Sequence, residues 1–168
     1  VEDFLKEYPE LINAYSHNKF IPQNYLESSI CQRKELLQGL LDTDGSIDLR
    51  SGSISYFTVS QELCKNIISL CRSLGIVATW CISQRKGKKD CWKINIQAPK
   101  EQKSELFRYS PKKQRALDYA NTKKREERRD RLAIIDIQPL GYEEEMTCFM
   151  VDNEEHLFLT NDFIVTHN

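Results

Sequence analysis

The chain has 168 residues, of which 40% are hydrophobic and 29% charged, so it can form one large or two small globular domains. Its formal net charge of −1 gives no bulk attraction to nucleic acid, so any such binding must come from local clusters of charge. No charged-then-apolar leader and no apolar run of about 18 residues is visible, which excludes a secreted or membrane-spanning class. We expect an intracellular, cytoplasmic protein without a membrane partner.

The six cysteines show no spacing typical of metal ligands, and two of them lie on an apolar helical stripe. We therefore expect reduced thiols, most of them buried.

Residues 1–17 have a helical pattern that restarts at Pro9, a residue suited to a first helical turn. The residue before Pro22 is biased towards extended geometry. Lys19, three residues earlier, is therefore expected in a loop or at a helix end.

Residues 32–43 place four leucines at helical spacing, with Gly39 and Thr43 four residues apart on one side. Small residues at this spacing let two helices approach closely. Gly45 follows the helix and suits a left-handed exit.

A first hairpin is predicted from two short alternating runs, 46–50 and 53–60, separated by a Ser-Gly pair. Ser60 then suits the N-cap of a helix whose apolar stripe ends at Gly75.

A second hairpin joins residues 76–84 to 91–97 through a basic turn. One alternating set is apolar, and the other carries hydrogen-bonding side chains of the kind that a β-ribbon presents to base edges in a major groove. The residues that we expect to bind DNA, on this face, in its turn and in the first hairpin, are Arg50, Thr79, Ser83, Arg85, Lys86, Lys88, Lys89, Lys93, Asn95 and Gln97.

A short helix near residues 100–108 would complete an αββαββα order, an α+β domain over 1–110 with helices on the apolar face of one antiparallel sheet. Residues 111–131 carry many charges of both signs and are predicted to be a solvated helix or a charged connector between domains. Short strands from 132 to 168 indicate a separate all-β element. It is too small to hold a core by itself.

The segment LLQGLLDTDG ends the first long helix and places Asp44 next to last. An acid there adds to the negative end of the helix dipole, so the site repels phosphate and attracts Mg²⁺. The segment resembles the LAGLIDADG motif of homing endonucleases, although an amphipathic helix with a polar last turn is the alternative. The resemblance implies Mg²⁺ as cofactor, Asp44 as its ligand, and double-stranded DNA as partner.

The flanks add to this resemblance. Lys19-Phe-Ile-Pro is similar to the KxIP segment before the second LAGLIDADG copy of intein-borne endonucleases, and CRSLGI resembles the stretch that usually follows the motif. By the resemblance Lys19 lies near the scissile phosphates; the alternative is an ordinary solvated lysine.

The sequence closes on an apolar alternating run followed by His167 and Asn168. An imidazole exchanges protons near neutral pH, and an asparagine amide can attack its own main-chain carbonyl to form a succinimide. Residues 146–168 resemble the two C-terminal splicing motifs of inteins. The resemblance implies that Asn168 cyclises, that His167 polarises the scissile peptide bond and that His156 gives or takes a proton.

In the same resemblance Cys148, where many members have aspartate, helps to set up or resolve the branched ester; its alternative is a buried thiol, and that of His156 a core histidine. Splicing needs no cofactor. The all-β element would be the C-terminal part of the Hint splicing fold.

The chain starts with valine and holds one LAGLIDADG copy. Our hypothesis is therefore the C-terminal portion of a larger intein. Its partners would be flanking exteins and an N-terminal part that carries the Cys or Ser nucleophile and the first LAGLIDADG copy. The rival is a non-catalytic LAGLIDADG-like DNA-binding module or a relic endonuclease, which leaves the His-Asn pair unexplained.

Overall fold

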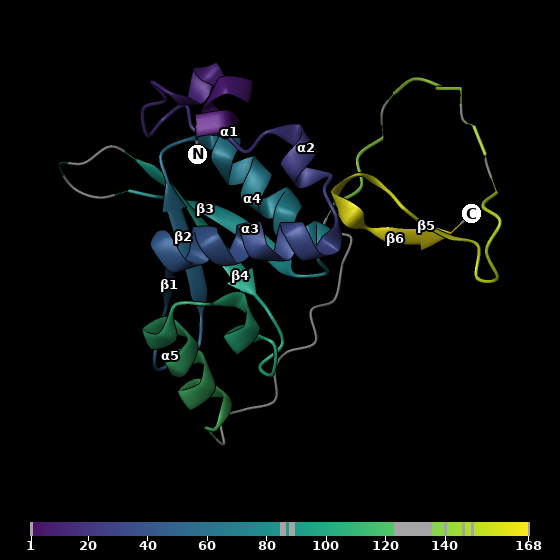
Figure 1. Ribbon diagram of the computed structural model, residues 1–168. Helices are drawn as coiled ribbons and strands as arrows, with labels where there is room; N and C mark the ends of the chain where they lie inside the picture. The colour runs from purple at the N-terminus through teal and green to yellow at the C-terminus, as the bar shows by residue number, and fades with distance from the viewer. Residues whose placement is uncertain are drawn as a thin grey trace. The chain divides into compact units, whose positions relative to one another are not determined.

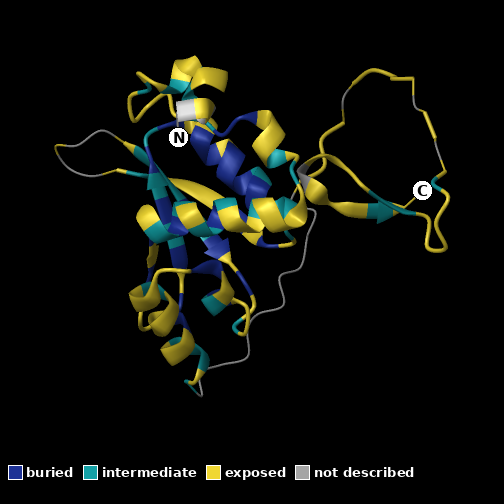
Figure 2. Cartoon of the chain, viewed as in Figure 1, coloured by how far each residue is buried: buried dark blue, intermediate teal, exposed yellow. Residues whose placement is uncertain are grey.

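The computed structural model describes residues 2–84, 87, 90–122, 136–139, 141–145, 147–148 and 150–167 (Figures 1 and 2). Its contacts divide the chain into a first unit, Val1–Glu127, and a second unit, Arg128–Asn168. The two units are described separately. No helix in the described parts of the chain is long and apolar enough to cross a membrane.

The first unit is a mixed α+β domain built on one antiparallel sheet of strand order β1-β2-β4-β3. The predicted α+β class is therefore confirmed. The helices and strands are α1 (Glu2–Glu7), η1 (Pro9–Leu11), α2 (Gln23–Leu26), α3 (Ile30–Thr43), β1 (Gly45–Ile47), β2 (Ile54–Thr58), α4 (Gln61–Ser73), β3 (Val77–Ser83), β4 (Cys91–Gln97), η2 (Lys103–Leu106) and α5 (Ser110–Ala120).

Side-chain caps fix where the two long helices begin. Ser29 and Gln32 form a capping box at α3, and the Ser60 hydroxyl accepts from the Leu63 N–H at α4, as its position predicted. The expectation of a left-handed exit at Gly45 was wrong, because this glycine starts β1 without a positive φ. Glycine is required here because the chain passes close to the end of α3: a Cβ at residue 45 would lie 2.6 Å from the Leu41 carbonyl oxygen.

The core lies between one face of the sheet and the helices α3 and α4, which cross that face (Figures 1 and 2). Alternate strand residues point into it, as the period of two requires. The predicted apolar set of the second hairpin has this register, but Trp80 and Ile82 are each 52% exposed. Both residues belong to β3, the edge strand of the sheet, so a neighbouring strand covers them on one side only.

The helix predicted near 100–108 is only a 3₁₀ turn, η2, and the following helix, α5, lies where a solvated helix or a connector was expected. Pro111 fits the first turn of α5, and Ala116 is fully buried. The first ten residues or so beyond the expected boundary at 110 therefore belong to the packed first unit.

In the second unit, β5 (Leu157–Leu159) pairs antiparallel with β6 (Val165–His167), and η3 (Asn161–Phe163) lies between them. These are two of the predicted strands. The described residues of the other two, 136–139 and 145–151, have no regular structure; residues 132–135 lie outside the described residues. Among the described residues of this unit, the predicted all-β pattern is therefore seen only in the β5–β6 ribbon.

Candidate metal and nucleic-acid site

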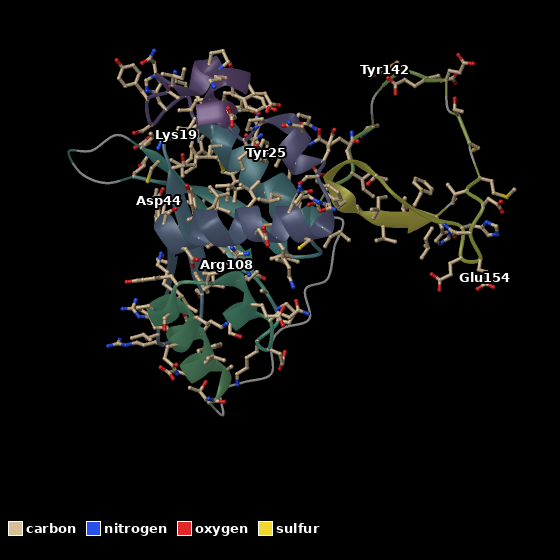
Figure 3. The ribbon with its side chains drawn as sticks, viewed as in Figure 1. Lys19, Tyr25, Asp44, Arg108, Tyr142 and Glu154 are labelled. Carbon is tan, nitrogen blue, oxygen red and sulfur yellow. The ribbon has the colours of Figure 1, made fainter. Side chains whose placement is uncertain are left out.

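Asp44 lies at the C-cap of α3, where its backbone N–H donates to the Leu40 carbonyl oxygen at 3.1 Å. The residue is exposed (Figure 3). Its Oδ2 accepts a hydrogen bond from the buried Tyr56 hydroxyl at 3.4 Å. The helix α3 and the strand β2 thus hold this carboxylate at the surface.

Tyr56 was not indicated by the sequence pattern, because its place in β2 shows only that it faces the core. Burial raises the pKa of Tyr56 to about 12, and the Asp44 carboxylate beside it adds to the shift. The phenol therefore stays protonated and acts as a neutral donor to the carboxylate.

A second missed residue is Lys112 of α5, which fell in the predicted connector. Its Nζ lies close to four backbone carbonyl oxygens around the end of α3, those of Leu41 (2.8 Å), Asp42 (2.7 Å), Thr43 (3.3 Å) and Gly45 (2.7 Å). An ammonium here satisfies carbonyls that a helix end leaves without partners. It also offsets the negative end of the helix dipole on which the sequence argument for Asp44 relied.

Lys19 is exposed in the loop before α2, as its place before Pro22 predicted (Figure 3). Its backbone carbonyl accepts from the Ser60 hydroxyl at 2.6 Å. Ser60 lies four residues after Tyr56, the partner of Asp44. An extended chain of that length spans at most roughly 14 Å, so this anchor of the Lys19 backbone is linked to Tyr56 by a short piece of chain.

The sheet face opposite α3 and α4 carries the polar side chains predicted to bind DNA. The register aligns Ser46, Ser55, Asn95 and Thr79 in one row across all four strands, and it places Lys93 between Phe57 and Cys81 in the next row. These side chains are exposed or partly exposed. Ser46, Ser55 and Phe57 were not predicted, because strand order is needed to place β1 and β2 beside the second hairpin. Cys81 was also missed, although it alternates with Thr79 and Ser83 in β3.

The other predicted DNA-binding residues are less fully placed. Ser83 and Gln97 lie on the same face at the two ends of the β3–β4 ladder. Arg50 is exposed in the β1–β2 turn, where its N–H donates to Asp48. The four basic residues of the β3–β4 turn, Arg85, Lys86, Lys88 and Lys89, lie outside the described residues.

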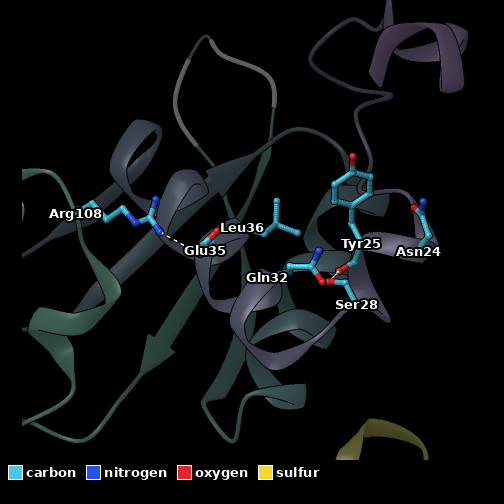
Figure 4. A pocket seen from close by; sticks show the side chains of 7 residues that line it. All are labelled: Asn24, Tyr25, Ser28, Gln32, Glu35, Leu36 and Arg108. Carbon is cyan, nitrogen blue, oxygen red and sulfur yellow. Dashed lines mark hydrogen bonds and ion pairs between the residues drawn. The ribbon is translucent and has the colours of Figure 1, made fainter. Parts of the chain in front are cut away.

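The outer side of α3 carries a stripe of Gln32, Leu36, Gly39 and Thr43. A Cβ added at Gly39 would meet nothing within 4 Å, so this side is open. A pocket of about 520 Å³ lies beside the first half of the stripe, and the Arg108–Glu35 ion pair of 2.9 Å bounds it (Figure 4). Its lining is Asn24, Tyr25, Ser28, Gln32, Glu35, Leu36 and Arg108.

Within the described residues no group of three or more His, Cys, Asp or Glu side chains could hold a metal ion. Asp44 is therefore a single carboxylate rather than a protein-only cage. Mg²⁺ is commonly bound in this way, by one or two carboxylates together with waters and substrate phosphates. The Asp44 carboxylate can therefore supply one ligand of such a site, with waters and phosphate oxygens as the others.

In the second unit, the β5–β6 register sets His167 opposite Leu157, so it lies next to His156 across the ribbon. His156 has a φ of 53°, and its Nδ1 lies 3.0 Å from the Val151 carbonyl oxygen. Cys148 is exposed in an irregular segment, and Asn168 lies outside the described residues. Of the four predicted splicing residues, the register thus makes His156 and His167 near neighbours along the backbone of the ribbon.

Comparison with known proteins supports the assignment of the first unit. Residues 32–110 match the family model of the LAGLIDADG-like domain. The chain is also 31% identical over 155 residues to the replicative DNA helicase DnaB of Mycobacterium intracellulare. That match covers 90% of the chain, so it extends beyond the first unit into the second.

The chain spans 26% of the length of that helicase. Residues 32–110, which run from α3 to the first residue of α5, are thus similar to a LAGLIDADG-like domain, and this similarity fits a domain of the homing endonuclease type.

Proposed function

We propose that the first unit is one half of a homing endonuclease that binds double-stranded DNA on its sheet face and cuts it with Mg²⁺. The observation that carries the proposal is the exposed Asp44 carboxylate at the end of α3, in a domain that matches the LAGLIDADG-like family. The polar rows on the open face of the sheet support DNA as the partner.

Each residue has a definite task in this proposal. Asp44 binds the cation through its carboxylate, and Tyr56 holds one carboxylate oxygen by its hydrogen bond. Lys19 brings a positive charge towards the phosphate that is cut. The bound Mg²⁺ would supply an activated water and offset the charge that develops on the phosphate.

The second half would pack on the open stripe of α3. Gly39 is exposed, and a methyl group placed on its Cα would have nothing within 4 Å, so another helix can approach the backbone there. In our proposal this helix is the first LAGLIDADG copy, on the N-terminal part of the same intein. It would bring a second carboxylate to the site.

The test is an Asp44→Asn substitution in the chain supplied with its complementary half. We expect loss of Mg²⁺-dependent cutting of a target duplex and unchanged DNA affinity, with Asp118→Asn on the exposed side of α5 as the charge-matched control. Full cutting by Asp44→Asn would exclude the metal assignment. Binding without cutting by the unsubstituted protein in every divalent cation would favour the non-catalytic module or relic.

A second activity, protein splicing, is favoured by the adjacent histidines of the second unit and by the DnaB match, since DnaB helicases carry inteins in some species. We propose that the Asn168 side-chain nitrogen attacks its own carbonyl carbon, forms a succinimide and releases the amine of the next residue. His167 polarises that peptide bond, His156 transfers a proton, and Cys148 acts on the branched ester.

This activity is tested separately from the nuclease. A precursor would carry the missing N-terminal part and a Cys- or Ser-led extein after Asn168. We expect Asn168→Ala to stop release of the downstream extein and Asp44→Asn to leave it intact. Release that persists in Asn168→Ala would exclude the cyclisation.

A further inference from the structure

Lys112 makes a set of contacts that a solvated helix lysine would not make. An ammonium has three N–H donors, and four carbonyl oxygens lie within 2.7 to 3.3 Å of Nζ. Its donors are therefore all engaged by backbone. In this arrangement Lys112 has no donor to spare for a phosphate.

The four carbonyls belong to residues on both sides of Asp44 in the sequence. Three belong to the last turn of α3, and the fourth belongs to Gly45, the first residue of β1. The Asp44 N–H is itself held by Leu40. One side chain thus fixes the backbone on both sides of Asp44, and it does so from a separate helix, α5.

This contact also makes the helix end less negative. A positive charge beside the last carbonyls offsets the dipole and weakens the pull on a cation. If charge alone mattered, removal of Lys112 would tighten cation binding. If Lys112 serves to hold Asp44 in one direction, its removal would weaken cation binding, because a mobile carboxylate must first be ordered.

We propose that Lys112 is a positioning residue for Asp44: it locks the junction of α3 and β1 so that the carboxylate points in the direction in which it binds a divalent cation. This inference rests on the proposed function, in which Asp44 is the cation ligand.

The test compares Lys112→Met with Lys113→Met in the full chain. Met keeps the length of the stem but has neither charge nor donors, and Lys113 is the exposed neighbour on the same helix, so the two variants change net charge equally. Mn²⁺ serves as the probe, and the paramagnetic broadening of the Asp44 and Gly45 amide NMR signals reports its binding. Backbone order parameters of the same amides report how rigidly the junction is held.

We expect Lys112→Met to need about tenfold more Mn²⁺ for the same broadening, the loss typical when a supporting contact to a metal ligand is removed. The order parameters at Asp44 and Gly45 should fall, and Lys113→Met should match the unsubstituted protein in both measurements. Tighter or unchanged Mn²⁺ binding in Lys112→Met would overturn the inference.

Two further variants keep the outcomes separate. If Lys112→Met does not fold, Lys112→Gln takes its place, because its uncharged and shorter side chain cannot reach all four carbonyls; an unchanged Mn²⁺ requirement would then overturn the inference. Asp44→Asn tests the underlying site: broadening that persists there would contradict the proposed metal function. Unchanged order parameters in Lys112→Met would contradict the role of Lys112 alone.

Discussion

The hydroxyl of Tyr56 lies 3.4 Å from Oδ2 of Asp44, so a buried, neutral donor holds one oxygen of an exposed carboxylate. The bond joins the middle of β2 to the end of α3. It gives the carboxylate a preferred direction without adding charge to the site.

Tyr56→Phe removes this donor and keeps the ring in the core. We expect a loss of about 0.5–1.5 kcal/mol in the free energy of unfolding, the usual net value of one hydrogen bond, and a higher Mg²⁺ requirement for cutting. Chemical denaturation and Mg²⁺ titrations of cutting measure the two effects. An unchanged Mg²⁺ requirement would mean that the Tyr56 hydroxyl does not orient Asp44.

The sequence predicts Asp44 as a site residue but does not predict Tyr56 or Lys112, and this difference has a physical cause. Asp44 is marked by local features, an amphipathic helix that ends in an acid and glycine. Lys112 is 67 residues from Gly45, whose carbonyl it contacts, and only the packing of α5 brings them together. Such contacts depend on tertiary structure, which local sequence patterns do not predict.

The same reasoning explains the misplaced third helix. Residues 111–120 are rich in charge, so they suggest a solvated helix or connector, but the structure buries Ala116 and anchors Lys112 at the end of α3. In contrast, the strand alternation correctly predicted which hairpin residues share a face. A period of two fixes that property locally.

Asn95 and Lys93 provide contrasting tests of the sheet face. Asn95 lies in the polar row of all four strands, so Asn95→Ala should cost about 1–3 kcal/mol of binding to the target duplex and relax preference at one base pair. Lys93→Ala should weaken binding to all duplexes and lower the salt dependence by about one ion. Binding titrations at several salt concentrations measure both.

The control is Lys65→Ala, since Lys65 is exposed on α4, which covers the other face of the sheet. Its loss should leave both quantities nearly unchanged. An equal effect of Lys65→Ala and Lys93→Ala would show that bulk charge, and not the sheet face, binds the DNA.

Gly39→Ala should have opposite effects on the stability of the chain and on its association with the complementary half. A methyl group at this exposed helix position meets nothing within 4 Å, so the chain alone should gain about 1 kcal/mol in the free energy of unfolding from better helix propensity. The same methyl would obstruct a helix that approaches the stripe. Thermal denaturation of the chain and titration with its complementary half should therefore change in opposite directions.

If the helix of the complementary half docks on another part of the first unit, Gly39→Ala should leave the affinity between the two halves unchanged. That result would contradict the proposed packing of the first LAGLIDADG copy on α3.

Gly52 and Gly75 both have a positive φ, but only Gly52 also lacks space. A Cβ at Gly52 would lie 2.3 Å from the Tyr119 ring, whereas a Cβ at Gly75 meets nothing within 4 Å. Gly75→Ala should cost about 1–2 kcal/mol from backbone conformation alone. Gly52→Ala should cost about 1–3 kcal/mol more, from overpacking between the β1–β2 turn and α5.

Chemical denaturation of the two variants measures this difference. If they are equally destabilised, the turn can move away from Tyr119 at no cost, and α5 does not hold it. Gly52→Ala should also weaken DNA binding through Arg50, which lies in the same turn.

Two buried thiols, those of Cys64 and Cys71, should make the free energy of unfolding depend on pH in alkaline solution. Burial raises the pKa of Cys64 to about 11 and that of Cys71 to about 12, from an ordinary value of 9.0. The folded chain therefore keeps protons that the unfolded chain loses above pH 9. Their stabilising effect is complete below about pH 9 and is lost progressively as the pH rises towards 12.

Cys71→Ala tests this directly, because alanine cannot ionise. The variant is expected to be less stable at neutral pH, since it leaves a small cavity, but its free energy of unfolding should fall less steeply between pH 9 and 12. Cys31→Ala, at an exposed thiol, should keep the slope of the unsubstituted protein. Equal slopes for all three proteins would show that Cys71 ionises with the same pKa in the folded and unfolded chain, and so is reached by water in the folded state.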